Sequence, residues 1–282
     1  MLESLEVAMF YSLVIATTLC MLLYLVWLGV RNEFVGRLAT YLTIIAILAS
    51  TFAIILRIIT SGHPPLSNGY EFILTFVWGI MVVYLFVEYR YKIKALGAFV
   101  MPIAFLLLMF IIMTMGPVDR VAQAIPPALK SVWLTFHVVT ATFAYGAFAL
   151  SFGLGIMYLF KSSKSETTNN LKPKGIVARF PSLETIDELS YKVVGFAFPL
   201  LTLCIITGAI WANYAWGTYW SWDPKETWSL ITWIIYAAFL HARLMYGWKG
   251  KRAAWMAIFG FAAVLFTFFG VNYLLSGLHS YS

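Results

Sequence analysis

The sequence predicts an all-α polytopic membrane protein with about eight transmembrane helices. Of its 282 residues, 62% are hydrophobic and only 11% are charged, and the mean hydropathy is +0.85. A soluble domain would carry about a quarter charged residues. The apolar residues also gather into segments of about 20, the length that a helix needs to cross a bilayer. We therefore expect a single integral membrane domain over residues 1–282.

Eight segments are long and apolar enough to span the membrane. The third is short, and the fifth is long enough to tilt or to extend beyond the bilayer. The segments are 5–29, 38–60, 71–88, 95–115, 132–160, 191–213, 228–246 and 254–275.

The basic residues predict how these segments are oriented. Fifteen of the 19 Lys and Arg residues lie at one set of helix ends and four at the other. Because basic residues are enriched on the cytoplasmic side, both termini should be extracytoplasmic. The loops at 61–70, 116–131 and 214–227 should lie on the same outer side. The net charge of +7 follows from this asymmetry, so we expect no nucleic-acid partner.

The segment 161–190 connects the fifth and sixth spans on the cytoplasmic side. It opens as a flexible linker, KSSKSETTNNLKPKG. After the linker, Leu183, Ile186 and Leu189 follow helical spacing, with acidic residues opposite. This pattern predicts a short interfacial helix that leads into the sixth span.

The outer loop between the sixth and seventh spans is rich in tryptophan. An interfacial aromatic belt would explain some of these residues, but a belt usually spreads over several helix ends. If the loop is helical, Trp216, Trp220 and Asp223 share one face. Such a surface suits a flat, apolar, aromatic ligand such as a macrocycle. The aromatic residues in segment 211–228 are Trp211, Trp216, Tyr219, Trp220, Trp222 and Trp228.

The end of this loop has the pattern of a helix start. Asp223 can cap the seventh span, Pro224 suits the first helical position, and Glu226 completes a capping box. We therefore expect Asp223 to cap the helix and to serve a ligand indirectly, by fixing the loop.

The four histidines differ in their expected depth. His63, His137 and His279 reach the outer face, whereas His241 lies 13 residues past Trp228, about 20 Å along a helix. A lone helical histidine is usually a hydrogen-bonded core residue. Three histidines beside an aromatic loop favour a ligand set, because imidazole is a natural axial ligand of haem iron. The spacing does not select which two of the three would hold one iron.

These residues resemble those of a known family. The stretch WGTYWSWDPKETWSLITW is similar to the WWD domain of the CcsA (ResC-like) haem-handling proteins of system II cytochrome c biogenesis. A WWD motif alone would also fit the CcmC and CcmF proteins, but WDPKETW followed by GVNYLLSGLHSY resembles CcsA. The other matching stretches are GHPPLSNGYEF, LTFHVVTATFAYGAF, IDELSYK and YAAFLHARL.

The resemblance implies that haem b is carried across the membrane and docks on the outer WWD surface. There its vinyl groups would form thioether bonds with the CxxCH thiols of an apocytochrome c. It assigns His137 and His279 as axial ligands of the outer haem and His241 as a ligand of an inner haem. The residues that match the WWD domain itself are Trp216, Trp220, Trp222 and Asp223.

The resemblance also implies partners. A CcsB-like membrane protein would supply the other transmembrane histidine, so this chain would be one half of a cytochrome c synthase, or haem lyase. Cys20 and Cys204 lie inside apolar segments, so reductant and thiols must come from elsewhere, including a thiol-reducing protein. The membrane would be the bacterial inner membrane or a thylakoid membrane.

Three other functions compete with this one. The first is a haem exporter or chaperone of CcmC type, in which another protein performs the attachment. The second is a di-haem electron-transfer subunit, which needs histidine pairs at matching depth, although only His241 lies deep. The third is a transporter of other solutes, which the scarcity of charge within the spans disfavours. Arg57 and Arg243 lie near helix ends and are expected to reach water or to meet haem propionates.

Overall fold

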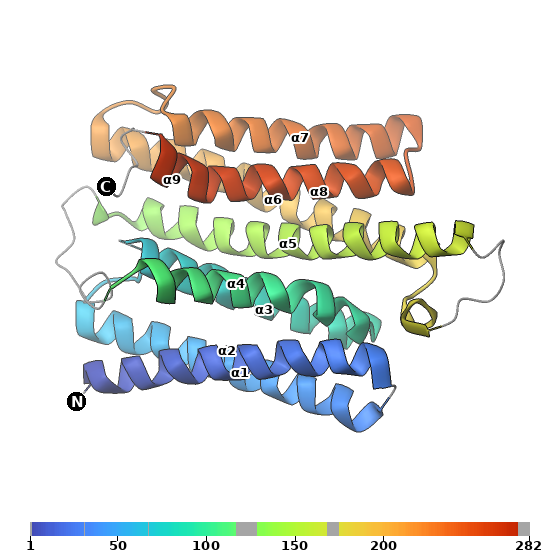
Figure 1. The fold of residues 1–282 in the computed structure, drawn as a ribbon. Coiled ribbons are helices and arrows are strands. Elements are labelled where there is room, and N and C mark those ends of the chain that lie inside the picture. Colours follow the sequence, from blue (N-terminus) through green and yellow to red (C-terminus); the bar gives the residue numbers. More distant parts are fainter. Residues whose placement is uncertain (1, 31, 67, 117–128, 168–174, 276–282) are drawn as a thin grey trace. The chain divides into compact units, whose positions relative to one another are not determined.

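The computed structural model describes residues 2–30, 32–66, 68–116, 129–167 and 175–275, and this part of the chain is helical, without a strand (Figure 1). Eight of the described helical segments are long and apolar enough to cross a membrane, which confirms the all-α, multi-span fold. The helices are α1 (Leu2–Val30), α2 (Glu33–Ser61), α3 (Gly69–Tyr91), η1 (Lys94–Leu96), α4 (Gly97–Thr114), α5 (Val132–Thr167), η4 (Gly175–Arg179), α6 (Leu183–Trp216), α7 (Pro224–Tyr246), α8 (Lys251–Leu265), the π-helix η5 (Phe266–Gly270) and α9 (Val271–Leu274).

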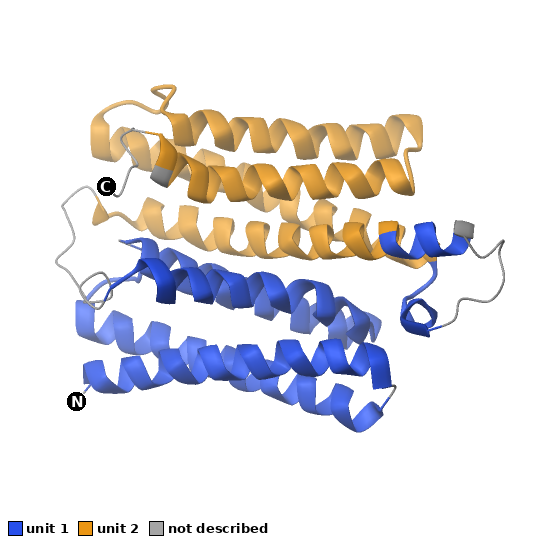
Figure 2. Cartoon of the chain, in the orientation of Figure 1, with its two compact units in different colours: residues 1–124, 160–182 blue, residues 125–159, 183–282 orange. Residues whose placement is uncertain are grey.

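The chain divides into two compact units. Unit 1 comprises residues 1–124 and 160–182 and contains α1 to α4, whereas unit 2 comprises 125–159 and 183–282 and contains α6 to α9 (Figure 2). Helix α5 belongs to unit 2 as far as Leu159 and to unit 1 beyond it. This division does not test the prediction of a single integral membrane domain, which stays a prediction.

Unit 1 is built on a close pairing of α1 with α2, and both α1 and α3 also pack against α4. Ala39, Ala46 and Ala53 of α2 are fully buried and recur at intervals of seven residues. Small side chains at this spacing lie on one face of the helix and let a neighbouring backbone approach closely, as is common between membrane helices.

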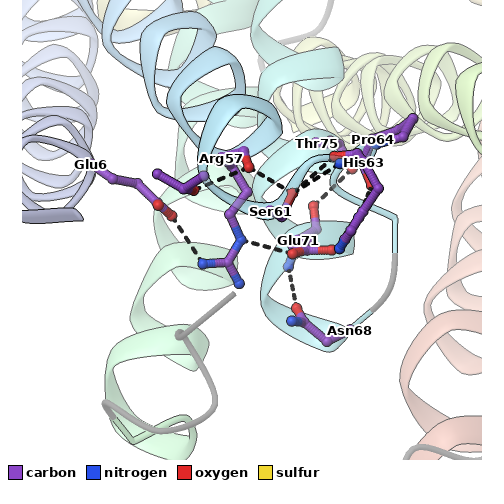
Figure 3. Close-up of polar contacts among 9 residues, drawn as sticks. Glu6, Arg57, Ser61, His63, Pro64, Asn68, Glu71 and Thr75 are labelled. Atoms are coloured by element: carbon purple, nitrogen blue, oxygen red, sulfur yellow. Dashed lines mark hydrogen bonds and ion pairs between the residues drawn. The ribbon is translucent and has the colours of Figure 1, made fainter. Parts of the chain in front are cut away.

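Arg57 is buried in unit 1 and does not reach water. Its Nε donates to Oε1 of Glu71 at 2.7 Å and its Nη1 donates to Oε1 of Glu6 at 3.3 Å (Figure 3). All three side chains are almost fully buried. The expectation that Arg57 extends to water is therefore wrong, because carboxylates from α1 and α3 compensate its charge inside the helix bundle.

A third buried carboxylate, Glu88, lies toward the other ends of the same helices. Oε2 of Glu88 accepts hydrogen bonds from the hydroxyls of Tyr24 and Tyr84, each at 2.6 Å, and Oε1 accepts one from Thr40 at 2.5 Å. Hydrogen bonds of this kind compensate a charged acceptor that burial removes from water. Glu88 thus joins α1, α2 and α3 near one end, as Arg57 does near the other.

Helix α6 lies entirely within unit 2. The residues predicted to form a short interfacial helix leading into the sixth span form the first turns of α6, which continues to Trp216. The linker residues 168–174 lie outside the described part of the chain.

Asp187, in the first turns of α6, contacts Nη1 of Arg243 at 2.5 Å and accepts a hydrogen bond from the Gly250 backbone at 2.7 Å. The Arg243 side chain is only 9% exposed. The expectation that Arg243 extends to water is therefore wrong as well. Through this pair, α6 is fixed to α7 and to the turn that precedes α8.

Candidate functional site

The tryptophan loop between α6 and α7 is not helical. Helix α6 ends at Trp216, and α7 begins at Pro224. Gly217 has a φ of +77° and its N–H bonds to the carbonyl of Asn213, which closes the helix. The conditional prediction of one helical face shared by Trp216, Trp220 and Asp223 is therefore wrong, because a left-handed residue separates the first from the other two.

The start of α7 is the capping box that the sequence predicts. Oδ1 of Asp223 accepts from the Lys225 backbone at 2.9 Å, and Oε2 of Glu226 accepts from the Asp223 backbone at 3.3 Å. Asp223 is buried, which agrees with a role in fixing the loop.

Glu226 does more than the capping pattern requires. Its Oε2 also accepts hydrogen bonds from the backbone N–H of Ser221 at 2.7 Å and from the Ser221 hydroxyl at 3.2 Å. One carboxylate oxygen thus gathers three donors and holds the last turn of the loop. The sequence indicated Glu226 only as a capping residue, and its contact with Ser221 carries no sequence signal.

Two pairs of tryptophans lie here, one in the last turns of α6 and one in the loop. Trp211 and Trp216 meet edge to face with ring centroids 4.9 Å apart, and Trp220 and Trp222 do so at 5.8 Å. Trp211 is buried, whereas Trp222 is 69% exposed. Trp222 also adopts a φ of +61°, a left-handed conformation that is costly for a bulky side chain. The second pair is therefore an accessible aromatic surface held in a strained backbone.

His137 of α5 lies beside the first pair. Its ring stacks on Trp211 with centroids 6.4 Å apart and planes 23° apart. Its Nδ1–H donates to the backbone carbonyl of Cys204 at 2.7 Å. A hydrogen bond at Nδ1 fixes the tautomer and leaves Nε2 with its lone pair. Among the described residues, Nε2 of His137 has no hydrogen-bond partner, so it can serve as a ligand.

Gly208 of α6 makes this position of His137 possible. A Cβ atom at residue 208 would lie 2.6 Å from Nδ1 of His137, which is closer than real Cβ contacts. Only glycine leaves room for the imidazole to reach the Cys204 carbonyl one helical turn away. No pattern in the sequence predicts this close approach.

The turns η5 and α9, which follow α8, contact the first turns of α7. Nζ of Lys225 donates to Oδ1 of Asn272 at 3.1 Å, and the ring of Trp228 packs on Phe266 at a centroid distance of 4.1 Å. Phe266 opens the π-helical turn η5. Such single π turns are frequent at functional sites. Neither the π turn nor the contact between Lys225 and Asn272 was predicted.

His241 and His63 have other contacts. His241 is exposed on α7, and its ring meets Tyr246 at 5.7 Å. His63 belongs to unit 1, where it is buried and its Nδ1 lies 2.9 Å from the Pro64 carbonyl (Figure 3). His279 lies outside the described residues. The structure therefore gathers His137, Trp211 and Trp216 at one place.

Comparison with known proteins identifies the family. Residues 66–279, which include the tryptophan loop, match the family model described as cytochrome c assembly protein. The chain belongs to the cytochrome c assembly protein family. It is thus a multi-pass membrane protein of cytochrome c biogenesis.

Individual relatives extend the match beyond the range of the family model. A protein of Guillardia theta named cytochrome c biogenesis protein CcsA is 41% identical, over 94% of this chain and 93% of its own length. One of the same name from Gloeobacter violaceus is 36% identical over 98% and 95%. This member of the cytochrome c assembly family therefore resembles CcsA over nearly its whole length.

A solved structure named cytochrome c heme lyase CcmF shares the fold. It superimposes with a TM-score of 0.69 at 18% sequence identity, over 95% of this chain and 47% of that one. The chain thus spans about half the length of that protein. At this identity the likeness shows the fold alone, so the helix arrangement is common to both members of the comparison.

Proposed function

We propose that this protein carries haem across the membrane and presents it at the tryptophan loop for covalent attachment to apocytochrome c. It would act as one half of a cytochrome c synthase, together with a CcsB-like membrane protein. Haem b is the substrate of this reaction and not a resident cofactor. Membership of a cytochrome c biogenesis family supports this proposal.

The observation that carries the proposal is the state of His137. Its Nδ1–H bonds to the Cys204 carbonyl at 2.7 Å, which turns Nε2 into the nitrogen available to a metal. Hydrogen bonding of the second ring nitrogen to a carbonyl orients ligating histidines and raises their basicity. His137 is thus equipped to be one axial ligand of an outer haem, and His279 is the proposed second ligand.

The aromatic residues suit the macrocycle. Trp222 is largely exposed and meets Trp220 edge to face, so the pair offers flat apolar area to a porphyrin. Trp216 belongs to the inner pair with Trp211 and would close the site behind His137. Asp223 would act indirectly, since its carboxylate caps α7.

The chemistry requires a thiol and a vinyl group. Each CxxCH thiol of the apocytochrome adds across one vinyl group of haem, so the S–H hydrogen moves to carbon and one thioether bond forms per vinyl. Both cysteines of this chain are buried, so the thiols come from the apocytochrome, kept reduced by a separate thiol-reducing protein. Two imidazoles on the iron would leave no position open to oxygen before transfer.

His241 is proposed as a ligand of an inner haem. It is exposed on α7, and one imidazole leaves one axial position of the iron open. A histidine of the CcsB-like partner would fill that position, with α7 facing the partner.

Reconstitution with the partner tests the proposal. Co-expression with a CcsB-like protein and an apocytochrome c should give haem-stained holocytochrome. His137→Ala and His279→Ala should each lower it strongly and convert a six-coordinate low-spin spectrum of the purified complex to a five-coordinate one. Added imidazole should restore the six-coordinate spectrum, and His63→Ala is the matched control.

Two outcomes would contradict parts of the proposal. Unchanged spectra in both ligand variants would remove the axial assignment. Bound haem without any covalent holocytochrome in the complete system would favour the alternative, a haem exporter or chaperone of CcmC type.

A further inference from the structure

A groove of about 590 Å³ opens between α2 and α3 of unit 1, near the ends that carry basic residues. Its walls are apolar and include Ile44, Val82 and Leu85, while Arg37, Lys92 and Lys94 line it with positive charge. Nothing in the proposed haem chemistry uses this groove.

The apolar walls face outward. Tyr41, Phe86 and Tyr89, which also line the groove, are 60%, 65% and 75% exposed. In a membrane-spanning helix bundle, such side chains meet lipid. An occupant would therefore enter sideways from the bilayer.

The three cations have no ion-pair partner within the described residues. The carboxylate of Glu88 also lies at the groove, but its oxygens accept from Tyr24, Tyr84 and Thr40 on the inner side. Glu88 is buried, whereas Arg37 and Lys92 are exposed. The positive charge at the groove is thus open to an external anion.

Lys92 occupies an unusual backbone conformation. It ends α3 with a φ of +57°, and its N–H bonds to the Glu88 carbonyl at 2.8 Å. Glycine is the common residue at such a left-handed helix end, because a Cβ atom is strained there. Lysine at this position holds its Nζ 4.3 Å from the centre of the Tyr89 ring, on the groove. A strained residue that presents a charge is a sign of binding.

We propose that this groove binds an anionic phospholipid. The phosphate lies among Arg37, Lys92 and Lys94, and one acyl chain lies along Val82 and Leu85. Basic pockets between transmembrane helices bind anionic headgroups in this way. The charge distribution of the chain places the groove in the cytoplasmic leaflet, where anionic lipids attract basic residues.

Native mass spectrometry of the purified chain tests the site. The probes are phosphatidylglycerol and phosphatidylcholine with identical acyl chains, added to the protein in detergent. The wild-type chain should retain phosphatidylglycerol in preference to phosphatidylcholine. In the variant Arg37→Gln/Lys92→Gln/Lys94→Gln, that preference should fall by about tenfold or more, since each basic residue near an anionic surface contributes several-fold in affinity.

The matched control removes three cations elsewhere on the same side. Lys249→Gln/Lys251→Gln/Arg252→Gln changes the net charge equally and should leave the preference unchanged. An equal loss in this control would show nonspecific attraction and overturn the proposal. Equal retention of the two lipids by the wild-type chain would overturn it too.

Two single variants separate binding from stability. Lys92→Gly relieves the left-handed strain and removes the cation, so it should weaken retention of phosphatidylglycerol without lowering the melting temperature. Leu85→Trp fills the part of the groove proposed to hold the acyl chain and does not change the charge. It should also weaken retention of phosphatidylglycerol. Hemin is added as a competing probe. If the wild-type chain retained hemin in place of phosphatidylglycerol, and the triple variant of Arg37, Lys92 and Lys94 did not retain hemin, the groove would bind a porphyrin and the proposal would be overturned.

Discussion

At the scale of single residues, the position of His137 depends on a residue that carries no chemistry of its own. Gly208 leaves the space in which the imidazole contacts α6, and the Cys204 carbonyl then fixes its tautomer. Neither contact has a signature in the sequence. His137 could be proposed from the sequence because a histidine near a span end beside a Trp-rich loop is chemically suggestive, but its orientation could not.

Gly208→Ala should therefore weaken the proposed haem site. The new methyl group would displace the imidazole and break its bond to the Cys204 carbonyl. We expect haem affinity to fall by about 10- to 100-fold, the usual effect of losing such a supporting contact. Haem titration followed by absorbance would measure this.

Gly195→Ala in the same helix is the matched control, because a Cβ there would meet nothing within 4 Å. If both variants bound haem as the wild type does, the contact between Gly208 and His137 would have no role in ligation.

Trp222 shows why the loop could not be predicted in detail. Tryptophan rarely adopts positive φ, so a reader of the sequence would place no left-handed residue there. The expected helical face depended on regular geometry that Gly217 and Trp222 both interrupt. The cap at Asp223 was predictable, since capping boxes are local and have a fixed spacing.

At the scale of elements, the eight spans follow from hydrophobic length alone, and the structure confirms them. Their ends do not follow, because helices continue beyond the apolar stretch wherever polar residues still favour helix. The first turns of α6 are one example, where Asp187 pairs with Arg243. The pairing of Arg57 with Glu6 was also beyond prediction, since the two are 51 residues apart.

Arg57 should be essential for the stability of unit 1. Arg57→Leu leaves Glu6 and Glu71 buried without their counter-charge, which costs about 3–5 kcal/mol when one partner of a buried pair is removed. We expect the detergent-solubilised variant to unfold at a markedly lower temperature than the wild type. Circular dichroism during heating would measure this.

A triple variant provides the control for this prediction. Glu6→Gln/Arg57→Leu/Glu71→Gln removes every charge of the cluster and should be more stable than Arg57→Leu alone. Equal melting of the single variant and the wild type would show that the cluster contributes little.

At the scale of the whole molecule, the charge asymmetry predicts how the chain lies in the membrane. Fifteen basic residues at one set of helix ends against four at the other predict that Gly250 lies in the cytoplasm and Ser282 outside it. The eight confirmed helices fit this alternation, since an even number of spans returns the chain to the side on which it began.

Reporter fusions check this orientation. A phosphatase that is active only outside the cytoplasm should work when fused after Ser282 and fail when inserted at Gly250. A fluorescent protein that matures only in the cytoplasm should give the opposite pattern. Cytoplasmic activity of the fusion at Ser282 would contradict the topology.

The ion pair between Asp187 and Arg243 also sets the rotational phase of α7. Residues two apart on an α-helix are separated by a rotation of about 200° around its axis, so their side chains point to nearly opposite sides. Arg243 is held against α6, and His241 consequently projects from the other side of α7, where it is exposed. A helix clamped in this way cannot turn about its axis. An incoming chain would then meet an imidazole already aimed outward, and little rotational freedom would have to be lost when a shared haem is bound.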